Sequence, residues 1–154
     1  MECTVESLQT VFSGVKTILV IDWPSKEVPE VLALAGFAVV VRGGPGPTDY
    51  SSYQVEGGLV VKHHIGRAPE RAELVYSYRP LSELQGIIDI AKTVHAHTIW
   101  TQSGLTADGK QDPKGCWVPQ VELEQARELV QSAGFNHVSE PYIVEYIRRF
   151  HVAH

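Results

Sequence analysis

Few cysteines and no long apolar run are present in this sequence, and these absences exclude several classes of protein. Only two of the 154 residues are cysteines, Cys3 and Cys116, and no Cys/His spacing is typical of a zinc site. The longest apolar runs have about five residues, such as 37–41, whereas roughly 20 are needed to span a bilayer. The first residues also lack the basic and apolar segments of a signal peptide. We therefore expect a cytoplasmic protein without a disulfide framework and without a membrane partner.

Basic residues are also fewer than acidic residues. The chain has 13 Lys and Arg against 18 Asp and Glu, a formal net charge of −5. A protein that binds nucleic acid by neutralising phosphates needs a surplus of cations, so we expect no nucleic-acid partner. The length of 154 residues suits one domain, and we expect a single domain over residues 1–154.

Short apolar segments recur along the chain and are separated by helical patterns. Such continuously apolar runs are typical of strands buried on both faces, as in parallel sheets. The expected strands are 17–21, 37–41, a weaker one at 59–61, then 73–78, 97–101 and 135–138. The clearest helical stripe holds Leu81, Leu84, Ile88 and Ala91, and a later one runs from Val121 to Ala133. This alternation predicts an α/β fold: a doubly wound, mostly parallel sheet of five to six strands in three Rossmann-like layers.

In doubly wound sheets, ligands bind outside the carboxyl ends of the strands, so the loops there are examined first. The loop after the first strand reads Asp22-Trp23-Pro24-Ser25-Lys26 and contains no glycine. It therefore argues against a tight pyrophosphate cradle. Ser25 and Lys26 remain as candidate phosphate ligands, and the alternative for Ser25 is a helix N-cap.

Arg42 follows the second expected strand and precedes the glycine-rich stretch that begins at Gly43. An NAD site carries an acidic residue at this place, whereas a cation favours a phosphorylated ribose, as in NADP or the 3′-phosphate of CoA. Glycine lets the backbone approach a ligand closely. The alternative is an arginine solvated beside a loop.

Tyr78, Arg79 and Pro80 follow the fourth expected strand, and Gln102 follows the fifth. Arg79 can contact phosphate and Tyr78 can lie against an adenine or pantetheine group, although a structural salt bridge explains Arg79 equally well. Gln102 offers hydrogen bonds to a ligand amide, and Trp100 is interpreted as core.

No residue pattern indicates a catalytic group or a metal. His63 and His64 are adjacent, so in a strand they face opposite ways and cannot easily share a metal ion. No serine stands in a nucleophile elbow and neither cysteine has an evident base. We expect no catalytic residue and no metal ligand.

The segment 15–21 together with Tyr78-Arg79-Pro80 and the run 99–104 resembles the stand-alone CoA-binding domain proteins. These are single-domain relatives of the nucleotide-binding domain of the succinyl-CoA synthetase alpha subunit, and the resemblance covers about residues 5–138. It implies a Rossmann-like fold that binds CoA or a related nucleotide without an attached reaction. By position it implies binding roles for the residues at four strand ends: Ser25, Arg42, Gly43, Tyr78, Arg79, Pro80 and Gln102. The sequence departs from the family at 22–25, which replaces a Gly-Ala-Ser turn, in the inserted loop 106–117 and in the tail after Pro141.

Three functions follow from these observations. The leading one is a non-catalytic module that binds CoA, acyl-CoA or an adenine nucleotide. The second is a diverged scaffold or interaction protein that has lost its ligand, suggested by the glycine-free loop and by Tyr142, Tyr146 and Phe150 at helical spacing. An NADP-dependent oxidoreductase ranks third, because the pyrophosphate cradle is missing. Pairing into a homodimer stays open.

Overall fold

A computed structural model describes residues 10–21, 27–43, 46, 48–79, 83–102, 120–139 and 143–149. Its centre is a seven-stranded sheet in the order β4-β3-β2-β1-β5-β6-β7. The strands are β1 (Thr17–Ile21), β2 (Ala38–Arg42), β3 (Tyr50–Glu56), β4 (Leu59–His64), β5 (Leu74–Ser77), β6 (Thr98–Thr101) and β7 (Asn136–Val138). The five strands from β2 to β7 across the sheet are parallel. The predicted mostly parallel α/β fold is therefore confirmed.

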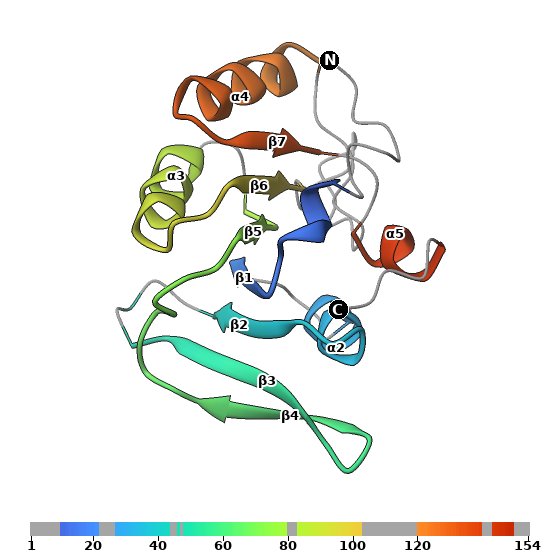
Figure 1. The fold of residues 1–154 in the computed structure, drawn as a ribbon. Helices are drawn as coiled ribbons and strands as arrows, with labels where there is room; N and C mark the ends of the chain where they lie inside the picture. Colours follow the sequence, from blue (N-terminus) through green and yellow to red (C-terminus); the bar gives the residue numbers. More distant parts are fainter. Residues whose placement is uncertain are drawn as a thin grey trace, which may run out of the picture.

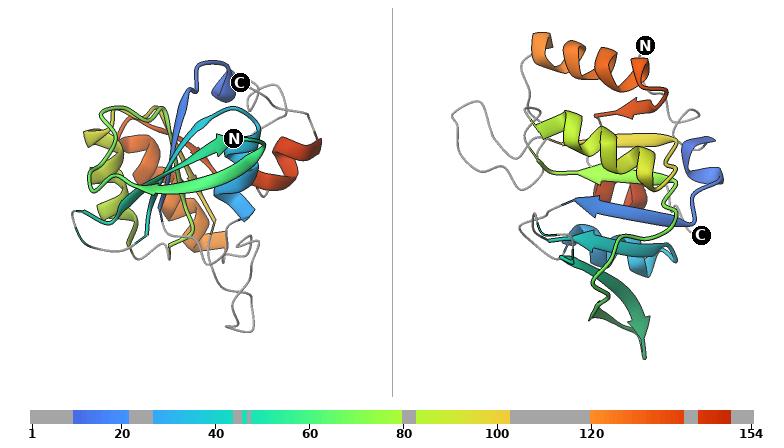
Figure 2. Two further views of the ribbon diagram at one scale, coloured as in Figure 1. Left: turned by 90° about the horizontal axis from the view of Figure 1, so that it is seen from below. Right: turned by 90° about the vertical axis from the view of Figure 1, so that its left-hand side faces the viewer.

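Helices cover both faces of this sheet and complete three layers (Figures 1 and 2). One face carries α2 (Glu27–Leu34) and α5 (Ile143–Arg149), together with a helical segment at residues 10–13. The other carries α3 (Leu84–Thr93) and α4 (Gln120–Ser132). We call them the α2/α5 face and the α3/α4 face. The carboxyl ends of the parallel strands point to a common edge of the sheet (Figure 2).

The sheet has one strand more than the five to six expected, because a hairpin replaces a single weak strand. β3 was not predicted, and it pairs antiparallel with both β2 and β4. Gly57 and Gly58 join the hairpin with φ of 60° and 82°. Positive φ at both central residues is the requirement of a type I′ turn, which favours Gly-Gly.

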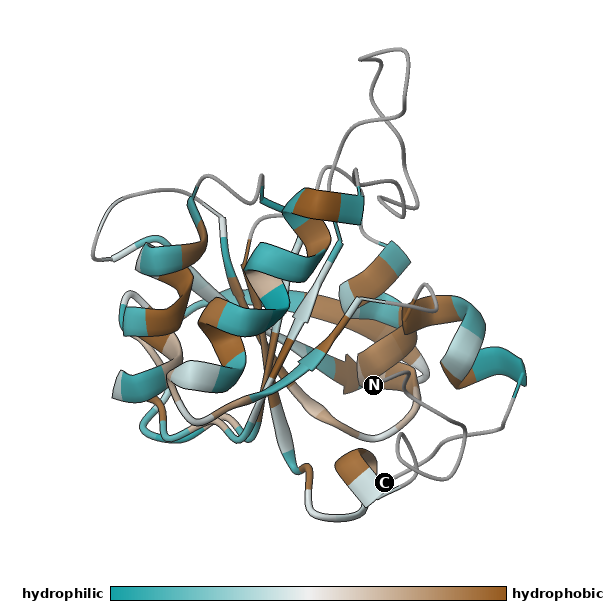
Figure 3. Ribbon diagram, turned by 90° about the horizontal axis from the view of Figure 1, so that it is seen from above, coloured by the Kyte–Doolittle hydropathy of each residue, from teal (hydrophilic) through white to brown (hydrophobic). Residues whose placement is uncertain are grey.

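Apolar side chains fill both sheet–helix interfaces, and the helices carry hydrophilic residues on much of their outward surface (Figure 3). On α3 the predicted stripe is confirmed for Leu84, Ile88 and Ala91, which are buried, while Leu81 lies outside the described residues. On α4 the prediction is wrong for Val121 and Leu129, which are 65% and 42% exposed. Only Ala126 and Val130 of this helix are buried, so a narrower stripe packs on β7 than the sequence suggested.

The order of the strands places a switch point between β1 and β5. From β1 the chain proceeds through β2, β3 and β4 toward one edge, and it then returns to continue on the other side of β1 with β5. Ligands of doubly wound sheets bind at the carboxyl edge where the order reverses in this way. The ends of β1, β2, β5 and β6 are therefore where a candidate site is to be sought.

Candidate functional site

A row of four residues ends the neighbouring parallel strands at this edge. Arg42 pairs in register with Ile21, Ile21 with Ser77, and Ser77 with Thr101. Residues opposite one another on adjacent strands share a face of the sheet. Ile21 packs in the core of the α3/α4 face, so the row presents Arg42, Ser77 and Thr101 on that face.

Arg42 is the last residue of β2 and is half-buried. It lies between Ile21 of β1 and Tyr50 of β3, and Tyr50 is buried in the α3/α4 core. The structure thus places Arg42 at the predicted edge, one strand from the switch point.

Gly43 continues from Arg42, and its N–H donates to the carbonyl of Asp49 at 2.9 Å. A Cβ atom added at this glycine would meet nothing within 4 Å. The absence of a side chain is therefore not required by the packing of the described residues, and Gly43 contributes exposed backbone at the end of β2.

Tyr78 and Gln102 lie at the same edge, but their side chains are drawn into the protein. Tyr78 is 8% exposed and belongs to the core of the α2/α5 face. Gln102 is 1% exposed, and its Oε1 accepts hydrogen bonds from the Tyr76 hydroxyl at 2.5 Å and the Ile143 N–H at 3.4 Å. The contacts of Gln102 therefore connect β5 and β6 to the first residue of α5.

Arg79 is held by Glu83, the residue before α3. Its Nη2 donates to Oε2 of Glu83 at 2.7 Å, and its Nε lies 3.2 Å from both carboxylate oxygens. The Arg79 N–H donates to Oγ of Ser77 at 3.1 Å. The salt bridge considered as an alternative from the sequence is therefore present, and it partly neutralises this cation.

Three of the predicted site residues, Ser25, Lys26 and Pro80, lie outside the described residues. The others divide between the two faces of the sheet. Arg42 and the Arg79–Glu83 pair belong to the α3 side, whereas the side chains of Tyr78 and Gln102 are buried on the side of α2 and α5. The set predicted from sequence thus shares an edge without forming one cluster.

Thr101 and His137 form a buried polar pair that the sequence did not indicate. Thr101 Oγ1 lies 2.8 Å from His137 Nε2, across β6 and β7. Burial and, as the smaller cause, the charge of Arg127 together lower the pKa of His137 from 6.5 to about 4. The ring is therefore neutral near pH 7 and extends the polar row of the α3/α4 face by one strand.

Tyr146 belongs to the core rather than to an exposed surface. It is 1% exposed and stacks on Phe12 with ring centroids 5.5 Å apart. Trp100 is also fully buried in this cluster, as predicted. Tyr142 and Phe150, the other members of the tyrosine-rich stripe, lie outside the described residues.

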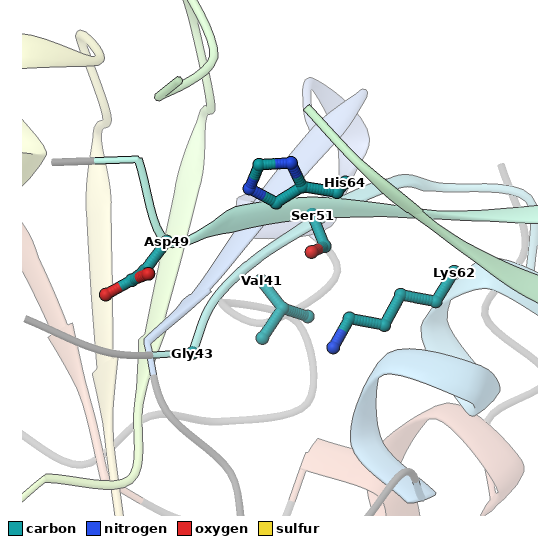
Figure 4. Close-up of a pocket in the computed structure, with 6 residues that line it drawn as sticks. All are labelled: Val41, Gly43, Asp49, Ser51, Lys62 and His64. Atoms are coloured by element: carbon teal, nitrogen blue, oxygen red, sulfur yellow. The ribbon is translucent and has the colours of Figure 1, made fainter. Parts of the chain in front are cut away.

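A pocket of about 280 Å³ opens beside this edge on the α2/α5 face, between β2, β3 and β4 (Figure 4). We call it the hairpin pocket; it is lined by Val41, Gly43, Asp49, Ser51, Lys62 and His64. Four of these residues come from the β3–β4 hairpin or the residue before it. Because that hairpin was not predicted in full, sequence reasoning did not find the pocket.

His63 and His64, adjacent on β4, have different hydrogen-bond partners. His63 Nε2 donates to Glu56 Oε2 at 3.0 Å, and His64 Nε2 donates to the carbonyl of Thr48 at 2.9 Å. Over the described ranges, no group of three or more His, Cys, Asp or Glu residues is placed to hold a metal ion. No helix in these ranges is long and apolar enough to cross a membrane.

Comparison with known proteins shows the fold. No protein-family model matches the chain, and no curated protein matches it. The solved structure of cell-free ID.343 from Thermus thermophilus is similar, with a TM-score of 0.56, 18% identity, and coverage of 95% of this chain and 98% of the other. Prb, the PH1109 protein redesigned for binding, matches with a TM-score of 0.55, 16% identity, and coverage of 98% and 94%. In both cases the two chains are matched over nearly their whole length at low identity, so the likeness is one of fold.

Proposed function

We propose that this chain is a non-catalytic module that binds CoA or an adenine nucleotide at the carboxyl edge of β1, β2 and β5. The observation that carries the proposal is the position of Arg42. Arg42 is the last residue of β2, one strand from the switch point, where a cation is suited to a phosphorylated ribose. The sequence resemblance to the CoA-binding domain proteins agrees with this choice of ligand.

The groups around Arg42 support binding rather than a reaction. Ser77 and Thr101 place hydroxyl groups on the same face of the sheet. His137, whose pKa is strongly lowered, is paired with Thr101 inside the protein. Both hydroxyl groups are buried and hydrogen-bonded within the protein, Ser77 to the Arg79 N–H and Thr101 to His137, so they make the edge polar without contacting a ligand directly. The hydroxyl–imidazole pair of Thr101 and His137 is buried, with 4% and 5% of these residues exposed, so it is not presented to a substrate as a nucleophile and its base would be.

Calorimetric titration with CoA, acetyl-CoA and NADPH tests the proposal. We expect heat of binding with CoA or acetyl-CoA, and we expect Arg42→Ala to weaken the affinity at least about ten-fold, as the loss of one charge-assisted phosphate contact predicts. The matched control is Lys92→Ala, which removes the same charge from the last turn of α3. Its affinity should equal that of the wild type.

Absence of heat with all three ligands at millimolar concentration would contradict the proposal and favour the scaffold alternative. Equal weakening by Lys92→Ala would show a general effect of net charge rather than a site at Arg42. Binding of NADPH with no binding of CoA would favour the third alternative, the oxidoreductase.

A further inference from the structure

The hairpin pocket lies on the opposite face of the sheet from Arg42. Val41 packs with the α2/α5 core, Ser51 is opposite Val41 in the ladder, and His64 is opposite Ser51. Lys62 is two residues before His64 on β4 and therefore shares its face. Arg42 alternates with Val41, so a phosphate bound at Arg42 does not occupy this pocket.

One end of the pocket offers hydrogen-bond donors. The Lys62 ammonium projects into it from β4, and the Ser51 hydroxyl projects from β3 (Figure 4). Ser51 is buried, with 7% of its surface exposed, so the hydroxyl is held in place by the sheet. Among the described residues, the salt bridges do not include Lys62. Its ammonium is thus available to an anion.

The other end offers a carboxylate acceptor. Asp49 uses Oδ2 to accept the Gly46 N–H at 2.8 Å, which fixes the carboxylate at the rim. The His64 ring is held beside it by the hydrogen bond from Nε2 to the Thr48 carbonyl. Figure 4 shows Asp49 and Lys62 at opposite sides of the space, with Val41 and Ser51 between them.

We infer that the hairpin pocket binds a small metabolite with an anionic group at one end and an ammonium or hydroxyl donor at the other. The anion lies against Lys62 and Ser51, and the donor lies against Asp49, with the His64 ring as a wall of the pocket. The volume of about 280 Å³ is at the lower limit of ligand pockets, which excludes a whole dinucleotide. Two classes of molecule carry this chemistry, α-amino acids and sugar phosphates.

Titration followed by ¹H–¹⁵N NMR tests the inference, with L-serine, D-ribose 5-phosphate and inorganic phosphate as probes. We expect L-serine or ribose 5-phosphate to shift the amides of Ser51, Lys62 and His64 in a saturable manner by about 10 mM, the range of weak metabolite binding. Saturation by L-serine assigns the amino-acid class, and saturation by ribose 5-phosphate assigns the sugar-phosphate class. No saturable shift at these amides with any probe would overturn the inference.

Single substitutions separate the two ends of the pocket. Lys62→Gln should weaken binding about ten-fold, because it removes the charge that faces the anion. Asp49→Asn should weaken L-serine or ribose 5-phosphate but leave inorganic phosphate unchanged. The matched control is His63→Gln. His63 lies between the pocket residues Lys62 and His64 on β4, and its side chain is on the other face of the sheet, so the substitution should not change the affinities. An unchanged affinity in Lys62→Gln would contradict the two-ended site. So would a second result, in which inorganic phosphate binds as tightly as the larger probes and Asp49→Asn has no effect. Arg42→Ala should leave these affinities unchanged, so this test and that of CoA binding fail independently.

Discussion

The Tyr76 hydroxyl donates a hydrogen bond to Oε1 of Gln102, and both side chains are buried between β5, β6 and α5. The same oxygen accepts the Ile143 N–H, the first backbone donor of α5. Donors at a helix N-terminus have no partner within the helix and need one from elsewhere. Gln102 therefore supplies an acceptor at the start of a helix that is 41 residues distant in sequence.

From this relationship we predict that Gln102→Ala lowers the free energy of unfolding by roughly 2–4 kcal/mol, because it leaves two buried donors without their acceptor. Tyr76→Phe should cost only about 1 kcal/mol, since Gln102 can still accept from Ile143. Urea denaturation measures both. Gln85→Ala on the exposed face of α3 is the control and should change the free energy by less than about 0.5 kcal/mol. If Gln102→Ala keeps full stability but loses ligand binding, Gln102 belongs to the binding site and not to the core.

Acid should destabilise the protein through His137. Its pKa falls from 6.5 in the unfolded chain to about 4 in the folded protein, so between these values the unfolded state binds more protons. The free energy of unfolding therefore decreases as the pH falls from 6.5 toward 4, by roughly 3 kcal/mol for this group alone. Urea titrations of the wild type and His137→Gln at pH 7, 6, 5 and 4 measure the difference.

Two other groups also contribute to the dependence of stability on pH. Their contributions cancel when wild type and His137→Gln are compared, because both proteins contain them. Burial also lowers the pKa of His97, which acts in the same direction. Burial opposes the ionisation of Glu73, but the N–H groups of Thr17 and Lys16 and the charge of Arg71 outweigh it and lower the pKa. The stabilising contribution of ionised Glu73 is therefore lost only as the pH falls below 4.5, the ordinary pKa of a glutamate. Identical pH profiles of wild type and His137→Gln would show that His137 is not neutral and buried in solution.

We also predict that Glu83→Gln strengthens the binding of CoA about two- to five-fold. The substitution releases Arg79 from its ion pair and removes a negative charge from the edge that receives the phosphates. Calorimetry at low ionic strength measures the affinity, and Glu124→Gln on the exposed side of α4 is the control. Weaker binding in Glu83→Gln would mean that the pair positions Arg79 rather than neutralising it.

The sequence predicted those strands whose side chains are buried on both faces. Thr17–Ile21 and Ala38–Arg42 are runs of β-branched residues, which sheets covered by helices require. β3 was missed because Tyr50–Glu56 is largely polar and its last three residues are exposed. The Gly57-Gly58 dipeptide between it and β4 was the signal that could have revealed the hairpin.

The site was less predictable than the sheet, because residues at a strand end can turn to either face. Arg42 could be placed at the edge from its position after an apolar run. The side chain of Gln102 points into the protein, where it accepts the N–H of Ile143 in α5. This partner is 41 residues away in the sequence, so the sequence near Gln102 does not indicate it. The partner of Arg79 was within four residues, yet a guanidinium near a carboxylate in sequence pairs with it only when the turn between them brings the two together.

The most direct test of nucleotide binding at this edge is a ¹H–¹⁵N NMR titration of the ¹⁵N-labelled protein with CoA. We predict saturable shifts at Arg42, Gly43, Ser77 and Arg79, where the carboxyl ends of β2 and β5 lie on either side of β1. Unchanged spectra at these amides at millimolar CoA, or shifts confined to the β3–β4 hairpin, would contradict it.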